Sequence, residues 1–266
     1  MFKNEIKIFF TAVMFYTRIP CPKWVDHSLE YLNKATRYFP FIGWIVGAFC
    51  FAIYYGAKHL FPIEISVIIS IVSGVLMTGA FHEDGFADVC DGFGGGWTKQ
   101  KILDIMKDSR VGAYGVIGLI LLFLLKFYLL LQIVQVTNTS SLHTNLSILL
   151  LFISAHSLSR LSAISIVFTH QYARDGEESK SKPVAQKNTW REICGTLLFG
   201  LMPIIFLAVF QYQILLVVPI VFLARFYLSA YLKKWIGGYT GDCLGATQQI
   251  SEVVFYLSVI GIWKFI

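Results

Sequence analysis

Residues 111–136 read VGAYGVIGLILLFLLKFYLLLQIVQV, and Lys126 is the only charged side chain in this run. A helix needs about 20 mostly apolar residues to cross the hydrocarbon core of a bilayer, so Val111–Val136 predicts a transmembrane helix. Six further apolar runs predict the same: Phe39–Tyr55, Ile63–Phe81, Leu146–Phe168, Ile193–Phe210, Ile214–Leu232 and the shorter Val253–Ile266. The sequence therefore predicts an all-α, polytopic membrane bundle of about seven transmembrane helices.

The composition also favours a membrane protein over a soluble domain. Hydrophobic residues make up 56% of the chain and charged residues 14%, and the mean hydropathy is +0.65. In soluble domains about a quarter of the residues are charged. No repeat or break in composition divides the chain, so residues 1–266 are expected to form a single domain. The five cysteines are scattered and include no C-x-x-C pair, which indicates apolar packing and not a zinc site.

The amino-terminal run Ile6–Tyr16 is apolar but too short to span a bilayer. Small residues that would mark the cleavage site of a signal peptide do not follow it; the sequence continues as Arg18-Ile19-Pro20. We expect an interfacial or re-entrant helix at this position.

Lysine and arginine gather in alternate connections between the predicted spans. Six lie in residues 1–38, four in 82–110, five in 169–191 and two in 231–249, whereas residues 132–145 and 211–213 carry no charged side chain. The positive-inside rule therefore predicts a cytoplasmic amino terminus and an outside carboxyl terminus. The net charge of +6 follows from this pattern and needs no nucleic-acid partner.

The most informative stretch is residues 81–96, FHEDGFADVCDGFGGG, at the predicted cytoplasmic end of the second span. Glu83, Asp84, Asp88 and Asp91 lie within it, and the three aspartates would share one face if the helix continues. Because like charges repel and are costly to desolvate at a membrane, a cation is expected among them. Oxygen ligands of this kind suit Mg²⁺ or Ca²⁺ rather than zinc. The alternative is a solvated acidic loop that caps the helix.

Two short motifs follow the acidic stretch. Gly94-Gly95-Gly96 would let backbone N–H groups approach a phosphate, although a glycine run can also be a flexible linker. A short helix is predicted from Thr98, as its cap, to Lys107, which would put Asp104 and Asp108 on one face. Lys107 and Arg110 supply positive charge suited to a phosphoryl group. An ordinary salt-bridged helix beside the membrane is the alternative reading of this second motif.

These motifs resemble those of two families. Asp88-x-x-Asp91-Gly92 followed by Asp104-x-x-x-Asp108 partly resembles the CDP-alcohol phosphotransferases, but the Ala-Arg pair of that family is missing. A closer resemblance, along nearly the whole chain, is to the cobalamin synthases, also named adenosylcobinamide-GDP ribazoletransferases. The motifs that carry it are Thr17-Arg18-Ile19-Pro20, His82-Glu83-Asp84-Gly85-Phe86-Ala87-Asp88-x-x-Asp91-Gly92, Met106-Lys107-Asp108-Ser109-Arg110-x-Gly112-x-Tyr114-Gly115, Tyr172-Ala173-Arg174 and Gly237-Gly238-x-Thr240-Gly241-Asp242, followed by Gln248, Gln249 and Glu252.

The resemblance implies an activity, a cofactor and a location. Cobalamin synthases join α-ribazole or its 5′-phosphate to adenosylcobinamide-GDP and release GMP, with Mg²⁺, at the bacterial inner membrane. The active site would then face the cytoplasm. The bundle would contact membrane lipid, and a homo-oligomer or association with other membrane-bound enzymes of nucleotide-loop assembly would be compatible with this role.

The resemblance also implies roles for residues of the acidic stretch and the second motif. Asp88 and Asp91 are expected as the core metal ligands, with Glu83, Asp84 and Asp108 completing the shell. By analogy with the last aspartate of the CDP-alcohol phosphotransferase motif, Asp108 is the first candidate for the base that deprotonates the ribazole hydroxyl, and Asp84 is the second. Lys107 and Arg110 are expected to stabilise the transferring phosphoryl group.

Further substrate contacts are expected from polar residues elsewhere. Arg160 and Arg225 lie inside predicted spans, where a charge is costly unless it faces a cavity or a partner, so each is a phosphate or corrin-amide contact or a structural pair. Lys126 is read as a snorkelling side chain or a member of a buried pair. Thr240 and Asp242 belong to a predicted cytoplasmic loop, Gly237–Gly245, that would contact the nucleotide or a second metal ion. The alternative for Asp242 is a helix cap.

Two other functional classes remain open at this point. One is a lipid-type CDP-alcohol phosphotransferase, which the missing Ala-Arg pair argues against. The other is a cation transporter, whose site would usually lie near the middle of the bilayer and not at its edge. The polar stretch Tyr172–Lys187 is interpreted as a lid over the corrinoid.

Overall fold

We analysed a computed structural model that describes residues 2–25, 28–136, 142–174 and 189–265. Within these ranges the chain is helical, with one isolated β-bridge between Tyr172 and Tyr239. The helices are α1 (Phe2–Tyr16), α2 (Leu29–Ala35), η1 (Thr36–Tyr38), α3 (Phe39–Ala57), α4 (Ile63–Thr78), α5 (Phe81–Gly95), α6 (Lys99–Ile105), α7 (Ala113–Val136), α8 (Leu142–Val167), α9 (Trp190–Ala208), η2 (Tyr212–Leu216), α10 (Val217–Ile236) and α11 (Gly241–Lys264).

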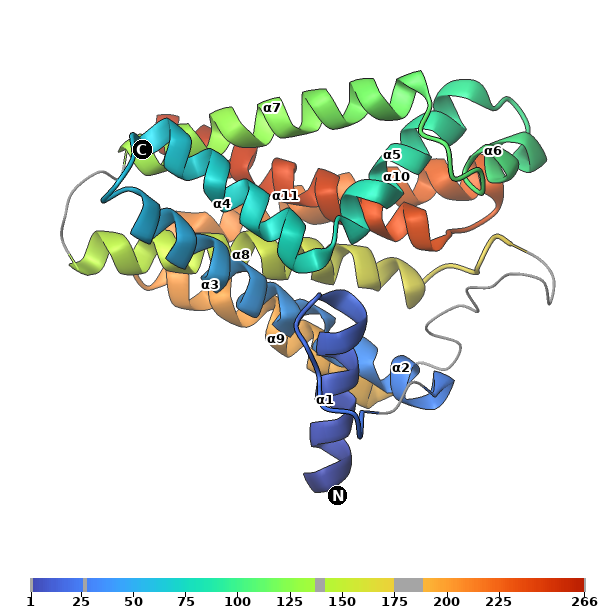
Figure 1. The fold of residues 1–266 in the computed structure, drawn as a ribbon, viewed down its shortest axis with the longest axis horizontal. Coiled ribbons are helices and arrows are strands. Elements are labelled where there is room, and N and C mark those ends of the chain that lie inside the picture. Colours follow the sequence, from blue (N-terminus) through green and yellow to red (C-terminus); the bar gives the residue numbers. More distant parts are fainter. Residues whose placement is uncertain (1, 26–27, 137–141, 175–188, 266) are drawn as a thin grey trace.

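The helices form a bundle whose members run largely along one axis (Figure 1). Six helical segments of the described chain are long and apolar enough to cross a membrane, and α4 with α5 would make a seventh, broken span. The predicted polytopic helical fold is therefore confirmed. Helix α1 lies crosswise to the bundle, as expected for a segment that does not span the membrane. The predicted lid at Tyr172–Lys187 lies mostly outside the described residues.

Helices α4 and α5 meet at an angle of 90°. Gly79, which ends α4, and Ala80, which precedes α5, both have left-handed backbone conformations, with φ of 67° and 57°. Glycine ends helices in this way because it adopts positive φ without a Cβ clash. The prediction of one continuous span from Ile63 to Phe81 is therefore wrong, and the acidic stretch forms a helix of its own.

The last helix, α11, begins at Gly241, twelve residues before the predicted start at Val253. Its first half contains buried polar side chains, among them Gln248 and Gln249, which lower the local hydropathy and hide the helix from a search for apolar runs. Thr240 caps this helix by accepting a hydrogen bond from the Cys243 N–H. The predicted loop Gly237–Gly245 is wrong in its second half, which is helical.

Close helix packing brings polar residues of α8 into the interior. A Cβ atom built on Gly43 of α3 would collide with the backbone carbonyl of His156, and one on Gly47 would lie 2.7 Å from the carbonyl oxygen of Phe152. Glycine at these positions lets α3 and α8 approach closely. The approach encloses His156 and Arg160 at the centre of the bundle, where Arg160 is 1% exposed.

Candidate active site

The acidic helix α5 carries its carboxylates at different depths. Asp84 is exposed, Asp88 is half-buried, and Glu83 and Asp91 are buried. Because Asp84, Asp88 and Asp91 belong to one helix at the spacing i, i+4 and i+7, they share a face, as the sequence predicted. The partners of each carboxylate decide what it can do.

Asp91 joins α5 to the beginning of α7. Its carboxylate oxygens accept hydrogen bonds from the backbone N–H groups of Gly112 at 2.7 Å and Gly115 at 2.8 Å. A Cβ atom on either glycine would collide with the carboxylate. The unpaired N–H groups and the dipole of a helix amino terminus stabilise an anion at this position. The structure therefore gives Asp91 a docking role, which the sequence analysis missed although it singled out both glycines, and the role of Asp91 as a metal ligand stays a prediction.

The start of α11 lies against the acidic helix. A Cβ atom on Gly85 would lie 2.9 Å from the Cα atom of Asp242, so the two backbones touch there. Asp242 forms an ion pair with Arg174 at 2.9 Å. The segment of Arg174 is held by two backbone hydrogen bonds, from the Ala173 N–H to the Tyr239 carbonyl and from the Tyr239 N–H to the Gln171 carbonyl. The structure thus brings Asp242 to the acidic helix, in the first turn of a helix and not in a flexible loop.

The carboxylates of α5 and α11 interact electrostatically. Asp88 experiences the negative charges of Asp242, Asp84 and Asp91 and the positive charge of Arg174. This excess of like charge favours a bound cation. Within the described ranges, however, no three His, Cys, Asp or Glu side chains are arranged as a ready-made metal site.

Asp108, Lys107 and Arg110 lie on the exposed connection between α6 and α7. The guanidinium of Arg110 donates to both oxygens of Asp108, the shortest of these hydrogen bonds being 2.6 Å, and lowers the pKa of that carboxyl to about 2. Thr98 caps α6 as predicted, but α6 ends at Ile105, so Asp108 does not continue the helix face of Asp104 as expected. The catalytic and metal roles of this connection stay predictions.

The glycine run ends α5 and does not form an open loop. Gly94 and Gly95 are helical, and the Gly96 N–H donates to the Gly92 carbonyl at 2.9 Å. A Cβ atom on Gly94 would lie 2.5 Å from the ring of Tyr114. The run therefore allows close packing of α5 against its neighbours, and the N–H of Gly96 is already used inside the protein, contrary to the expected phosphate loop.

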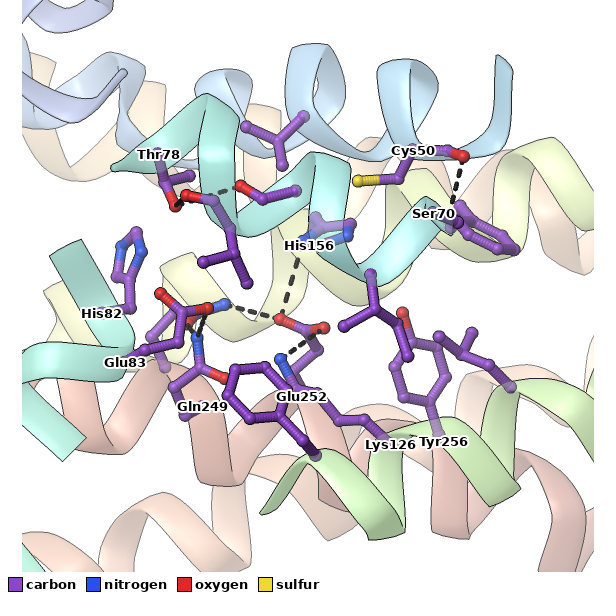
Figure 2. Close-up of a pocket in the computed structure, with 18 of the residues that line it drawn as sticks. Cys50, Ser70, Thr78, His82, Glu83, Lys126, His156, Gln249, Glu252 and Tyr256 are labelled. Atoms are coloured by element: carbon purple, nitrogen blue, oxygen red, sulfur yellow. Dashed lines mark hydrogen bonds and ion pairs between the residues drawn. The ribbon is translucent and has the colours of Figure 1, made fainter. Parts of the chain in front are cut away.

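A buried polar network lies in the interior between α5, α7, α8 and α11 (Figure 2). The Glu252 carboxylate of α11 lies 2.9 Å from Lys126 Nζ and 3.6 Å from His156 Nδ1, and it accepts a hydrogen bond from Gln248 at 2.9 Å. Gln249 donates to Glu83 at 2.9 Å. The buried-pair reading of Lys126 is therefore confirmed. Glu252, Gln248 and Gln249 were missed as site residues, although their polarity inside an apolar helix would have been the signal.

Four atoms of this network have no hydrogen-bond partner within the described structure: His82 Nε2, Glu83 Oε2, Arg160 Nε and Gln249 Oε1. All four residues line a cavity of about 30 Å³, large enough for a water molecule. Figure 2 shows His82 and Glu83 on one side of this cavity and Lys126 with Glu252 on another. The network anchors the amino-terminal end of α5 inside the bundle.

The two buried arginines have structural partners. Arg225 donates to the hydroxyl of Ser165 at 2.9 Å, to the Ser165 carbonyl at 2.8 Å and to the hydroxyl of Thr169. Arg160 donates to the His156 carbonyl at 2.9 Å. The contacts of Arg225 join α10 to α8, whereas the hydrogen bond of Arg160 lies within α8. Both agree with the structural alternative for these residues. Contact of either arginine with substrate stays a prediction.

A separate cavity of about 230 Å³ touches the acidic helix and the start of α11. Asp84, Asp242 and Arg174 line it together with several aromatic side chains. The site thus combines a partly open, largely aromatic space with two carboxylates and a guanidinium, an arrangement typical of a pocket for an organic substrate with a polar reacting group.

Comparison with known proteins identifies the family. The family described as cobalamin-5-phosphate synthase matches residues 8–260. A protein of Shewanella frigidimarina named adenosylcobinamide-GDP ribazoletransferase is 42% identical over 97% of this chain and 96% of its own. A protein of Leptospira interrogans with the same name is 44% identical over 99% and 98%. No solved structure matches. The chain therefore belongs to the cobalamin-5-phosphate synthase family.

Proposed function

We propose that the protein transfers the phosphorylated cobinamide of adenosylcobinamide-GDP to α-ribazole or its 5′-phosphate and releases GMP. The names of its relatives support the substrates. The observation that carries the proposal is the convergence of Asp84 and Asp88 of α5 with the Asp242–Arg174 pair beside an aromatic cavity. This step would complete the nucleotide loop of cobalamin.

The reaction is a phosphoryl transfer. The oxygen of a ribose hydroxyl forms a bond to the phosphorus that carries cobinamide, the bond from that phosphorus to the bridging oxygen breaks, and GMP leaves with the bond electrons. The hydroxyl proton passes to a base. Asp84 is favoured for this role because it lines the cavity, whereas Arg110 lowers the pKa of Asp108 to about 2 and makes Asp108 a weak base. Arg174 lies where it can neutralise phosphate charge.

The oxygen donors of the site fit magnesium. Mg²⁺ commonly binds through one or two carboxylates, substrate phosphates and water, so a cage of three protein carboxylates is not required. We assign Asp88 as the principal ligand, with Asp242 beside it, and keep Asp84 as the base. Glu83 and Asp91, on either side of these residues in α5, would be outer members of the set. When bound, the ion would neutralise charge on the diphosphate. Glu83 reaches the site less directly, because its carboxylate is engaged by Gln249.

The site is proposed to face the cytoplasm from a bacterial inner membrane. The positive-inside rule, applied to the connections of the bundle, supports this orientation. Helix α6, with Lys99 and Lys101, and the last turn of α10, with Lys233 and Lys234, lie at one end of the bundle. The turn between α3 and α4 lies with the carboxyl terminus at the other end (Figure 1).

The function is tested with purified protein in lipid nanodiscs. Adenosylcobinamide-GDP and α-ribazole 5′-phosphate are added with Mg²⁺, and GMP and the corrinoid product are measured by chromatography. We expect GMP and the nucleotide-loop product in equal amounts, both dependent on the second substrate. GMP formed without α-ribazole 5′-phosphate, or no GMP at all from folded protein, would contradict the proposed transfer.

A further inference from the structure

The cavity beside the acidic helix has an unusual wall. Aromatic side chains from five separate parts of the chain line it: Phe15 and Tyr16 of α1, Phe39 of α3, Phe81 of α5, Tyr172 after α8, and Tyr239 before α11. Several of these rings contact one another, with centroids 4.3 Å apart for Tyr16 and Phe39 and 5.6 Å apart for Tyr172 and Tyr239. The polar side chains Asp84, Asp242 and Arg174 line the same cavity.

The volume of the cavity limits what can occupy it. At about 230 Å³ it is smaller than the usual pockets for drug-sized ligands, which begin near roughly 300 Å³. A corrin macrocycle is far too large to fit inside it. A bicyclic aromatic base is of suitable size, and aromatic side chains bind such bases through their faces.

Two bicyclic bases take part in the proposed reaction, guanine and the benzimidazole of ribazole. Guanine carries several hydrogen-bonding groups around its edge, and burying them without partners is costly. The benzimidazole of ribazole is largely apolar and suits a wall of rings. Asp84, the proposed base, lines the cavity, and a nucleoside bound there by its base would present its ribose hydroxyls to the polar side.

We propose that this aromatic cavity is the binding site for the benzimidazole base of the acceptor nucleoside and determines the choice of acceptor. This inference rests on the proposed function for the identity of the substrate. It assigns a binding role to Phe15 and to the crosswise helix α1, which the catalytic argument does not use.

Phe15 offers a matched test within one helix. Phe15 lines the cavity, whereas Phe10, also on α1 and also half-buried, packs against Trp24 with ring centroids 5.4 Å apart. We expect Phe15→Leu to raise KM for α-ribazole 5′-phosphate about tenfold, within the range found for a lost base–aromatic contact. KM for adenosylcobinamide-GDP should stay within about twofold, and Phe10→Leu should change neither constant.

A second variant fills the cavity instead of widening it. Leu244 of α11 lines the cavity and is half-buried, so Leu244→Phe should place additional atoms in the space for the base. We expect this variant to raise KM for α-ribazole 5′-phosphate as well. If it fails to fold, the Phe15 and Phe10 pair still decides the question.

Binding is measured separately from turnover by equilibrium dialysis of labelled α-ribazole. Dissociation constants about tenfold higher for Phe15→Leu than for the wild type and Phe10→Leu would support the assignment, even if no GMP were formed and the proposed transfer failed. Equal α-ribazole affinities in all three proteins would overturn it. A selective increase in KM for adenosylcobinamide-GDP would overturn it in favour of a guanine site.

Discussion

Asp88→Asn and Asp91→Asn remove the same charge from the same helix, but only Asp91→Asn should destabilise the protein. Both oxygens of Asp91 accept backbone hydrogen bonds at the start of α7, from Gly112 and Gly115. Asparagine keeps one acceptor oxygen and would turn an N–H₂ group towards the other backbone donor. A hydrogen bond to a charged group contributes about 1.5–3 kcal/mol, and the helix dipole adds about 0.3–1 kcal/mol. We expect Asp91→Asn to lower the free energy of unfolding by about 2–4 kcal/mol.

Asp88 lies half-buried within the field of Asp84, Asp91 and Asp242. Removing its charge relieves repulsion, so Asp88→Asn should leave stability unchanged or raise it slightly in magnesium-free buffer. The free energies are measured by titrating SDS into protein in bicelles and following circular dichroism. Equal losses in the two variants, or a stable Asp91→Asn whose Mg²⁺ requirement has risen, would refute the docking role of Asp91.

The remaining expectations concern the interior network, the exposed connection and the topology. Lys126→Met should lower the free energy of unfolding by about 3–5 kcal/mol, because it leaves the Glu252 carboxylate buried without its ion-pair partner. The double variant Lys126→Met/Glu252→Gln should lose clearly less than the sum of the losses in the two single variants. Additive losses would show that the two side chains are not coupled. Turnover by Asp108→Asn should stay within about tenfold of wild-type turnover at pH 5–8, where a carboxyl with a pKa of about 2 does not titrate. A larger loss of turnover would indicate that Asp108 is the base. Cysteines introduced at Leu60 and Lys101 should react with impermeant maleimide from outside and inside the membrane, respectively, and labelling from one side only would contradict the orientation.

The spans were predictable because long runs of apolar residues are visible directly in the sequence. The ends of the helices were harder to predict where backbone conformation or buried polar groups determine them. The break after α4 depends on left-handed conformations at Gly79 and Ala80, and nothing in the apolar run Ile63–Phe81 required a bend there. The start of α11 was hidden because Gln248 and Gln249 are polar, and their burial is sustained by partners on other helices, Ser159 of α8 and Glu83 of α5.

The candidate site was predictable in its residue types and less so in their partners. Asp84, Asp88 and Asp91 look equivalent in sequence, but the contact of Asp91 with the start of α7 is made to residues more than twenty positions away. Arg174 belonged to a motif of the family resemblance, but its role became clear only from its ion pair with Asp242, 68 residues further along the chain. Such contacts depend on the packing of the helices, which a sequence pattern does not specify.

We propose above all that the carboxylates of α5 hold Mg²⁺ against the diphosphate. The most direct measurement is single-turnover release of GMP from adenosylcobinamide-GDP, titrated with Mg²⁺, in the wild type and in Asp88→Asn. We predict that chelation abolishes release by the wild type and that Asp88→Asn, although folded, is slower by at least about a hundredfold, equivalent to roughly 2.7 kcal/mol of transition-state stabilisation. Release that persists in EDTA, or a variant within tenfold of the wild type at every Mg²⁺ concentration, would contradict the claim.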